Sequence, residues 1–240
     1  MSTSGGKPRR PRAGARGATP AQRPAKKKPA PARRTAPDAR AALPIGPLRL
    51  GAIPGATPGK WIDTWKERMP RHPLELVPLA VADQEDALRA GVVDAAIVRL
   101  PVDREAWHAF SLYDELPVVV FGVDSHLGAA DELALADLEG EVRFVPSDDV
   151  LDVPLPGTVP PAFSTPLDTA EAIETVASGA GIVVVPMSLA RLHHRRDVTY
   201  RPLRGGPLSP VGFAWPRDDA SPLVDVLVGI VRGRSARSSR

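Results

Sequence analysis

The stretch from Asp83 to Pro101 constrains the fold most, because a predicted helix in it is followed almost at once by a predicted buried strand. Asp83 can cap the helix by accepting a hydrogen bond from the amide of Asp86, and apolar residues then recur at helical spacing. Residues 95–98 are apolar on both faces, as a strand covered by helices on each side of a parallel sheet requires. Arg99 follows at the carboxyl end of this strand, the edge where open α/β sheets bind ligands.

The sequence from Leu48 onward continues this alternation of strand and helix signals, which is the pattern of a parallel α/β fold. Asp168 and Glu171 form a predicted capping box at the start of one helix, and Ser221 followed by proline predicts the start of the last. The prolines between residues 147 and 166 exclude a regular helix there and predict a long loop. We expect strands at 48–53, 74–79, 94–100, 107–113, 117–123, 142–146, 162–164, 182–185, 198–203 and 211–215. We expect helices at 61–69, 83–90, 168–177, 187–196 and 221–231, with a short helical turn at 136–140.

Charge is distributed unevenly along the 240 residues. The overall net charge of +3 hides twelve Lys and Arg against one Asp in residues 1–47, a balance of +11. The last nine residues add four arginines, whereas residues 48–231 hold 15 basic and 27 acidic side chains, a balance of −12. The part expected to fold is therefore acidic, and the sequence pI near 9.5 comes from the two ends.

Residues 1–47 hold nine prolines and show no apolar period, so they cannot bury enough surface to offset chain entropy. We expect this segment and residues 233–240 to be disordered. The basic clusters can contact nucleic-acid phosphates without sequence preference, and base stacking is not expected because the segment has no aromatic residue. A solubilising tail, or a start codon assigned too early, is the alternative interpretation. The nucleic-acid contact candidates are Arg9, Arg10, Arg12, Lys26, Lys27 and Lys28.

Several classes of function lack the residues that they need. Zero cysteines exclude disulfides, thiolate catalysis and cysteine-ligated metal sites. No apolar run reaches membrane-spanning length, and the basic N-terminus lacks the apolar segment of a signal peptide, so we expect a cytoplasmic protein without membrane contact. No serine-nucleophile elbow, phosphate-binding loop, His-Glu-x-x-His motif or dinucleotide fingerprint occurs, so we expect no enzyme, no metal site and no cofactor.

Seven segments, in their order and spacing, resemble the effector-binding (substrate-binding) domain of LysR-type transcriptional regulators. They are LRLGAIPG from Leu48, the turn Arg71-His72-Pro73, ALRAGVVDAAIVRLP from Ala87, LYDELPVVV from Leu112, DSHLGAADELALADLEG from Asp124, ASGAGIVVVPMSLAR from Ala177 and VTYRPL from Val198. The resemblance implies the fold of type 2 periplasmic binding proteins, an α/β fold with mixed, mostly parallel sheets. Two lobes joined by two crossing strands would hold a small molecule between them. The domain would span 48–232, with lobe I at 48–122 and 207–232 and lobe II at 123–206.

Three loops of such domains contact the effector, at helix N-termini whose free amides hold an anion such as a carboxylate. This sequence departs from that chemistry, since Gly55 stands where Ser or Thr is common and Val81 where a hydroxyl is frequent. Aspartates at 148, 149 and 152 also follow Pro146 and Ser147, and their charge would repel an organic acid. A cationic effector, a neutral effector, or none are all left open. The candidate ligand contacts are Gly55, Ala56, Thr57, Val81, Asp83, Arg99, Pro146, Ser147 and Asp168.

Some of these residues also have a purely structural interpretation. Arg99 can neutralise a ligand carboxylate, but we favour its pairing with Asp103 or with an acidic residue across the hinge. For Thr57 we favour a role as the N-cap or a first-turn residue of the helix that follows it over contact with a ligand. Members of the family pair through the first helix of lobe I, so Trp61 and Trp65 lie either at a dimer contact or in the core.

The resemblance implies a small-molecule-sensing regulatory domain in transcriptional control, acting as a homodimer or in association with a complete regulator. No helix-turn-helix pattern occurs in the sequence, and the basic arm supplies only charge, so DNA contact through it would be non-specific. Two alternatives remain open. In the first, the chain is a solute-binding protein. In the second, it is a degenerate interaction domain whose cleft holds no ligand and which has no direct DNA role.

Overall fold

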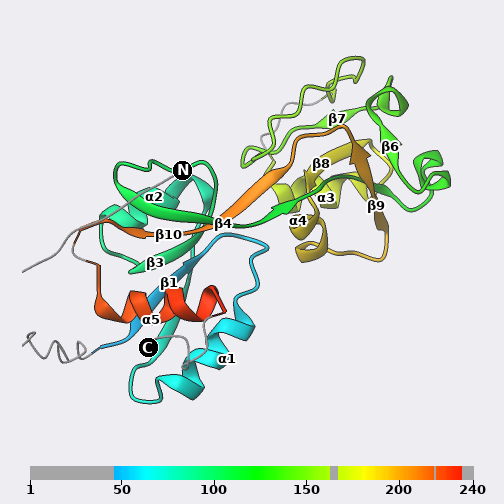
Figure 1. Ribbon diagram of the computed structural model, residues 1–240. Helices are drawn as coiled ribbons and strands as arrows, with labels where there is room; N and C mark the ends of the chain where they lie inside the picture. Colours follow the sequence, from blue (N-terminus) through cyan, green and yellow to red (C-terminus); the bar gives the residue numbers. More distant parts are fainter. Residues whose placement is uncertain (1–45, 163–166, 219, 234–240) are drawn as a thin grey trace, which may run out of the picture. The chain divides into compact units, whose positions relative to one another are not determined.

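Two five-stranded sheets, each with its own helices, make up the part of the chain that the computed structural model describes, residues 46–162, 167–218 and 220–233 (Figure 1). The two end segments that we expect to be disordered, 1–47 and 233–240, and the strand predicted at 162–164 lie almost entirely outside the described residues. The two-lobed α/β fold is confirmed. Each sheet contains two parallel and two antiparallel strand pairs, so the expectation of mostly parallel sheets is wrong. In each sheet, one strand next to a crossing between the sheets is antiparallel to both of its neighbours.

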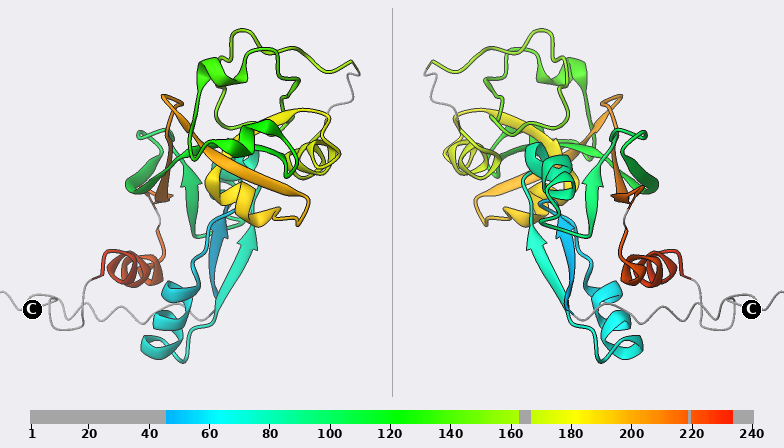
Figure 2. Two further views of the ribbon diagram at one scale, coloured as in Figure 1. Left: turned by 90° about the vertical axis from the view of Figure 1, so that its right-hand side faces the viewer. Right: turned by 90° about the vertical axis from the view of Figure 1, so that its left-hand side faces the viewer.

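The first sheet, here called lobe I with its helices, has the strand order β2-β1-β3-β10-β4. Its elements are β1 (Leu48–Ala52), α1 (Gly59–Arg68), β2 (Leu74–Pro78), α2 (Gln84–Arg89), β3 (Ala95–Arg99), β4 (Trp107–Glu115), β10 (Ser209–Pro216) and α5 (Pro222–Val231). Helices α1 and α5 lie side by side on one face of the sheet (Figure 2), and α2 packs on the other face. Strand β3 is buried on both faces, as its sequence predicts, because Ala95 and Ile97 contact one cluster and Ala96 and Val98 the other.

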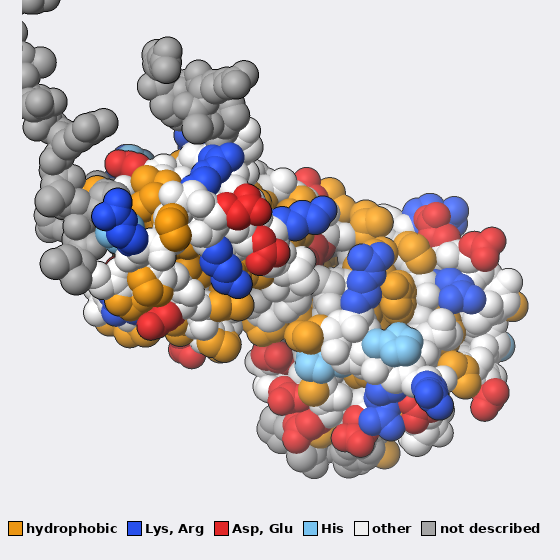
Figure 3. All heavy atoms as spheres, turned by 90° about the horizontal axis from the view of Figure 1, so that it is seen from below, with side chains coloured by type: hydrophobic (Ala, Val, Ile, Leu, Met, Phe, Trp, Pro, Cys, Tyr) orange, Lys and Arg blue, Asp and Glu red, His pale blue; other side chains and the backbone are white. Residues whose placement is uncertain are grey.

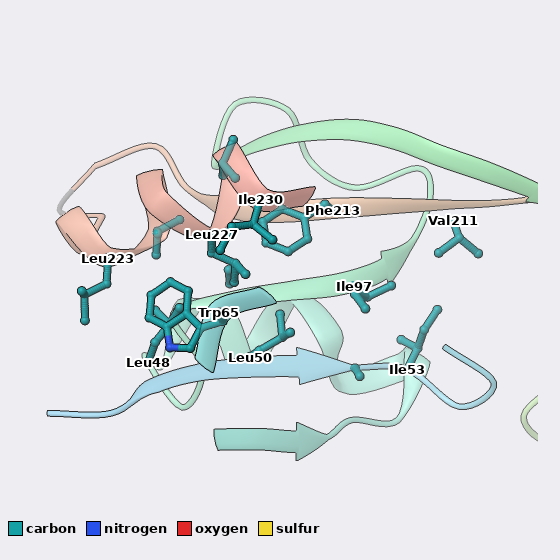
Figure 4. Packing of buried hydrophobic residues seen from close by; sticks show 14 residues of the cluster. Leu48, Leu50, Ile53, Trp65, Ile97, Val211, Phe213, Leu223, Leu227 and Ile230 are labelled. Carbon is teal, nitrogen blue, oxygen red and sulfur yellow. The ribbon is translucent and has the colours of Figure 1, made fainter. Parts of the chain in front are cut away.

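Trp65 lies at the centre of the cluster between α1, α5 and the sheet (Figure 4). Its side chain is fully buried, and the indole Nε1 donates a hydrogen bond of 2.7 Å to the carbonyl oxygen of His72. Trp65 is therefore a core residue and is not available for a dimer contact. Trp61, one turn earlier on α1, is only half-buried against the same cluster.

The second sheet, here called lobe II with its helices, has the strand order β6-β9-β5-β8-β7. Its elements are β5 (Pro117–Gly122), β6 (Leu133–Ala134), β7 (Arg143–Phe144), α3 (Thr169–Val176), β8 (Ile182–Pro186), α4 (Met187–Leu192) and β9 (Val198–Arg204). Short 3-10 turns complete the described elements, at Val81–Asp83 in lobe I and at His126–Ala129 and Leu135–Leu138 in lobe II. Helices α3 and α4 share a cluster with one face of the sheet. In the described ranges, no helix has the length and apolar character that crossing a membrane requires.

Strand β5 belongs to lobe II, where it pairs with β8 and β9. The chain therefore leaves lobe I at Leu116, directly after β4, and returns through residues 205–208 between β9 and β10. The predicted boundary between 122 and 123 is wrong by one strand. The apolar run of β5 fits the interior of either sheet, so its composition does not distinguish them.

Asp83 does not cap α2 as predicted. The turn Val81–Asp83 precedes the helix, and Asp83 itself has φ −97° and ψ −1°, whereas a capping side chain needs an extended backbone. Asp168 does have that backbone, with ψ 176°, and the capping box with Glu171 is confirmed.

Two other predicted elements are shorter than expected. Helix α4 ends at Leu192 rather than Arg196, because the backbone of His193 leaves the helical conformation, with φ −99° and ψ 31°. Strand β7 covers only two of the predicted residues 142–146, because the chain leaves the sheet to bond Ser147 to Leu167.

Candidate functional site

A cleft of about 750 Å³ lies between the two lobes. Lobe I lines it with residues 80–82, at the start of the 3-10 turn, and with the end of β3, and lobe II lines it with residues 147–150, the start of α3 and part of α4. The larger aliphatic side chains of the lining are those of Val81, Leu100, Val150, Leu189, Leu192 and Leu208. This volume is in the range of about 300–1,000 Å³ that is usual for small-molecule sites. Figure 3 shows Asp and Glu side chains on lobe II beside the hollow between the lobes.

The N-terminus of α3 already holds two carboxylates of the chain itself. Asp148 Oδ1 accepts hydrogen bonds of 2.8 Å from both the amide and the hydroxyl of Thr169. Asp168 Oδ1 accepts another of 2.8 Å from the amide of Glu171, whose side chain bonds back to the amide of Asp168. Free amides at a helix N-terminus attract anions, but here the acidic side chains of the protein take the place of an external one.

Arg99 is buried at the junction of the lobes, with 5% of its surface exposed. Its Nη2 lies 3.0 Å from Glu115 Oε2 at the end of β4, and its Nη1 donates a bond of 2.6 Å to Ser209 Oγ at the start of β10. The side chain of Gln84, at the start of α2, bonds to the backbone of Arg99 twice. Its Nε2 donates to the Arg99 carbonyl oxygen, and its Oε1 accepts from the Arg99 amide. Arg99 therefore pairs with an acidic residue, as predicted, but the partner is Glu115 at the hinge end of β4 in the same lobe, and neither Asp103 nor a residue across the hinge.

Glu115 also bonds to lobe II. Its Oε2 accepts a hydrogen bond of 2.8 Å from the hydroxyl of Ser188 on α4. Ser188 in turn lies against Gly55, which belongs to the loop between β1 and α1 of lobe I. A Cβ atom on Gly55 would lie 2.4 Å from the Ser188 hydroxyl, so glycine is required for this approach. Arg99, Glu115, Ser188 and Gly55 thus form one continuous contact between the lobes.

A second hollow, of about 560 Å³, is lined by three residues of this contact, Gly55, Glu115 and Ser188. Gly55, Ala56 and Thr57 line it from lobe I, and Met187 and Arg191 line it from α4. Tyr113 also lines this hollow. Partial burial raises the pKa of the Tyr113 hydroxyl, the charge of Glu115 acts in the same direction, and that of Arg99 opposes it.

The structure divides the predicted ligand contacts between the two hollows. Val81, Arg99, Ser147 and Asp168 line the cleft of 750 Å³. Gly55, Ala56 and Thr57 line the second hollow, and Thr57 does not cap α1, whose N-cap is Pro58. Asp83 lies on the exposed side of its turn and lines neither hollow, and Pro146 is buried behind Ser147 and lines neither.

Sequence reasoning missed Gln84, Glu115, Ser188 and His193 as residues of the site. Glu115 carried one signal, since an acidic pair between two apolar strands is unusual and marks a crossing between sheets. Gln84 and Ser188 carried none, because ordinary polar residues near a helix start fit solvent equally well. His193 reads as part of a cationic helix end, yet it lines the cleft because α4 stops one residue before it.

A family model of the LysR substrate binding domain matches residues 41–236. The Hca operon transcriptional activator HcaR of Escherichia coli K12 is 28% identical over 203 residues, which are 79% of this chain and 68% of HcaR. The HTH-type transcriptional regulator CatR of Pseudomonas putida is 30% identical over 161 residues, which are 63% of this chain and 55% of CatR. Both relatives are named as transcriptional regulators, and each is longer than the part that matches.

Solved structures agree with this assignment at the level of the fold. A variant of the OxyR regulatory domain of Pseudomonas aeruginosa is 24% identical with a TM-score of 0.61, covering 79% of this chain and all of that one. The BenM effector binding domain with its effector benzoate is 21% identical with a TM-score of 0.63, covering 80% of this chain and 93% of that one. Because the family model spans most of the sequence, the chain belongs to the LysR substrate binding domain family.

Proposed function

We propose that the chain senses a small molecule in the cleft between its lobes and acts in transcriptional control in the cytoplasm. The observation that carries this proposal is the cleft of 750 Å³, which has apolar walls and a few polar groups in a member of this family. Catalysis is not proposed, because the polar groups of the cleft bond to one another and the curated relatives are named as regulators. Pairing of two copies, or association with a complete regulator, stays a prediction.

A thermal-shift screen of carboxylic acids, amino acids and polyamines tests the proposal. We expect a saturable rise in the melting temperature for at least one compound, since a ligand that binds only the folded state stabilises it. Ala82→Trp should abolish the rise, because Ala82 is exposed and lines the cleft. Ala180→Trp is the matched control at an exposed position of lobe II outside the cleft. No rise with any compound would contradict sensing and favour the degenerate interaction domain, which the self-capped start of α3 also supports.

The basic arm at residues 1–47 is proposed as a second contact, to nucleic acid. Arg9, Arg10, Arg12, Lys26, Lys27 and Lys28 lie outside the described residues, so this proposal rests on the sequence alone. In an electrophoretic mobility assay we expect sequence-blind DNA binding whose affinity falls steeply with salt, by a log-log slope of about −0.9 for each phosphate contacted. Deleting residues 1–47 should abolish the shift. Binding that survives the deletion would place the contact elsewhere.

A further inference from the structure

We infer that the second hollow, which the end of β4 and helix α4 line, is a separate binding site for an uncharged molecule that carries a carboxamide on an apolar body. This inference goes beyond sensing in the larger cleft and does not depend on it. The volume of about 560 Å³ lies within the range of about 300–1,000 Å³ that is usual for small-molecule sites. Of the two hollows, it is the one that Tyr113 and Glu115 line.

Glu115 offers a hydrogen-bond acceptor to this hollow. The residue is nearly buried, with 8% of its surface exposed, and its Oε2 atom accepts the bonds from Arg99 and Ser188. The other carboxylate oxygen, Oε1, has no hydrogen-bond partner among the described residues. Unlike the Nε of Arg99, this oxygen is not closed off from solvent. Because Glu115 is otherwise enclosed by protein and lines this hollow but not the larger cleft, we assign the open side of Oε1 to the hollow.

Tyr113 offers a hydrogen-bond donor next to this acceptor. Tyr113 and Glu115 are two residues apart on β4, where the pairing with β10 is regular, and alternate residues of a strand project from the same face. The Tyr113 hydroxyl has no hydrogen-bond partner among the described residues, and a tyrosine hydroxyl can donate one hydrogen bond. A carboxamide has the complementary pair of groups, an N–H for the Glu115 oxygen and a carbonyl oxygen for the Tyr113 hydroxyl.

The charges around the hollow balance. Arg191 and Asp114 line it as exposed side chains, and Glu115 lines it with its charge paired to that of Arg99. These two positive and two negative groups sum to zero. A carboxylate ligand would be repelled at the free oxygen of Glu115, and a cation without an acceptor would leave the Tyr113 hydroxyl unpaired. The charges therefore favour an uncharged ligand.

Apolar side chains supply much of the remaining lining. Leu116 and Leu192 have 48% and 54% of their surface exposed, and both line the hollow together with Ala56 and Met187. Exposed apolar side chains that gather at one place indicate a binding site, whereas single ones do not. A phenyl or branched aliphatic group against these residues removes apolar surface from water, which favours binding in proportion to the area.

Four compounds of nearly one shape test the ligand class in NMR titrations of the full chain. They are benzamide, acetophenone, which lacks the donor, benzoate, which is an anion, and benzamidinium, which is a cation without an acceptor. We expect benzamide to bind most tightly, by about tenfold or more over acetophenone and benzoate, because a hydrogen bond to an ionised group contributes about a tenfold step in affinity or more. The amide signals of Tyr113, Leu116 and Ser188 should shift as benzamide binds.

Two tryptophan substitutions locate the binding. Thr57 is exposed and lines the second hollow but not the larger cleft, whereas Ala82 is exposed and lines the larger cleft but not the second hollow. Thr57→Trp should abolish benzamide binding, because the indole fills the hollow. Ala82→Trp is the matched control and should leave benzamide binding unchanged.

Two substitutions on β4 test the hydrogen bonds themselves. Glu115→Gln keeps an oxygen for Arg99 and Ser188 and places an N–H donor where Oε1 was. It should remove the preference for benzamide over acetophenone, since the site then offers a donor in place of an acceptor. Tyr113→Phe should weaken benzamide and acetophenone to the same extent, because both use their carbonyl oxygen at the Tyr113 hydroxyl.

The other outcomes overturn the inference. Equal affinities of benzamide and acetophenone for the unchanged protein would show that Oε1 does not select the ligand, and tighter binding of benzoate or benzamidinium would show that the ligand class is wrong. Loss of benzamide binding in Ala82→Trp but not in Thr57→Trp would place the molecule in the larger cleft, which contradicts this inference and supports the proposed function. Failure of all four compounds to bind would also overturn the inference, whereas the proposed function is decided separately by the thermal-shift screen.

Discussion

Replacing Glu115 by alanine is expected to lower the free energy of unfolding by about 3–5 kcal/mol, the usual cost of removing one partner of a buried ion pair. The substitution leaves the guanidinium of Arg99 buried with 5% of its surface exposed and without its carboxylate. It also removes the acceptor of the Ser188 hydroxyl, which links the hinge to lobe II. Urea denaturation followed by tryptophan fluorescence measures the loss.

Three further variants test whether the buried charge is the cause. Glu115→Gln keeps an oxygen acceptor for Arg99 and Ser188, and should therefore lose less than Glu115→Ala. The double variant Arg99→Met with Glu115→Leu should recover most of the stability, because it removes both charges at similar volume. Glu132→Ala breaks a solvent-exposed pair with Arg204 and should change stability by about 1 kcal/mol or less. A loss of that small size for Glu115→Ala would mean that water reaches Arg99 in solution.

Local patterns predicted the strands and helices, because each depends on residues that are close in the sequence. The capping box of Asp168 and Glu171 spans four residues, and the burial of β3 follows from its own apolar run. The same reasoning placed Asp83 as a cap and was wrong, since a 3-10 turn can use the residue that a helix start would use. Local signals thus predict that a helix begins, but not always which residue begins it.

The contacts that shape the site depend on residues far apart in the sequence. The side chain of Arg99 bonds to Glu115, which lies 16 residues later in the sequence, and to Ser209, which lies 110 residues later. The sequence offered Asp103 or an acidic residue across the hinge as partners, whereas the structure pairs Arg99 with Glu115 of its own lobe, where β4 lies beside β10 and Ser209 is opposite Glu115. The lobe boundary failed for the same reason, because pairing of β5 with β8 and β9 is decided by topology.

The hydroxyl that the resemblance led us to expect is missing at Gly55, and the structure supplies a physical reason for the glycine. Ser188 of lobe II brings its own hydroxyl to this loop and leaves no room for a side chain on the glycine. The glycine at this position is therefore required by a contact between the lobes.

Gly55→Ala should accordingly destabilise the protein by about 2–4 kcal/mol, combining a left-handed backbone with overpacking. Gly55 has φ +83°, and a Cβ atom there would lie 2.4 Å from the hydroxyl and 2.7 Å from the Cβ of Ser188. Gly91→Ala is the matched control, because Gly91 has φ +64° but nothing within 4 Å of the added atom. The control carries only the backbone cost, so the difference between the two variants measures the contact between the lobes.

A double-mutant cycle assigns that difference to Ser188. Ser188→Gly removes both atoms that a Cβ on Gly55 would meet first, whereas Ser188→Ala removes only the hydroxyl and leaves the Cβ atom at 2.7 Å. Gly55→Ala combined with Ser188→Gly should therefore be more stable than the sum of the single changes predicts, by about 1–3 kcal/mol, and the combination with Ser188→Ala should recover less. Equal losses for Gly55→Ala and Gly91→Ala, with no coupling to Ser188, would show that the two lobes do not hold this contact in solution. The polar chain from Arg99 through Glu115 to Ser188 would then end at the hinge, and lobe II would be free to move relative to the first loop of lobe I.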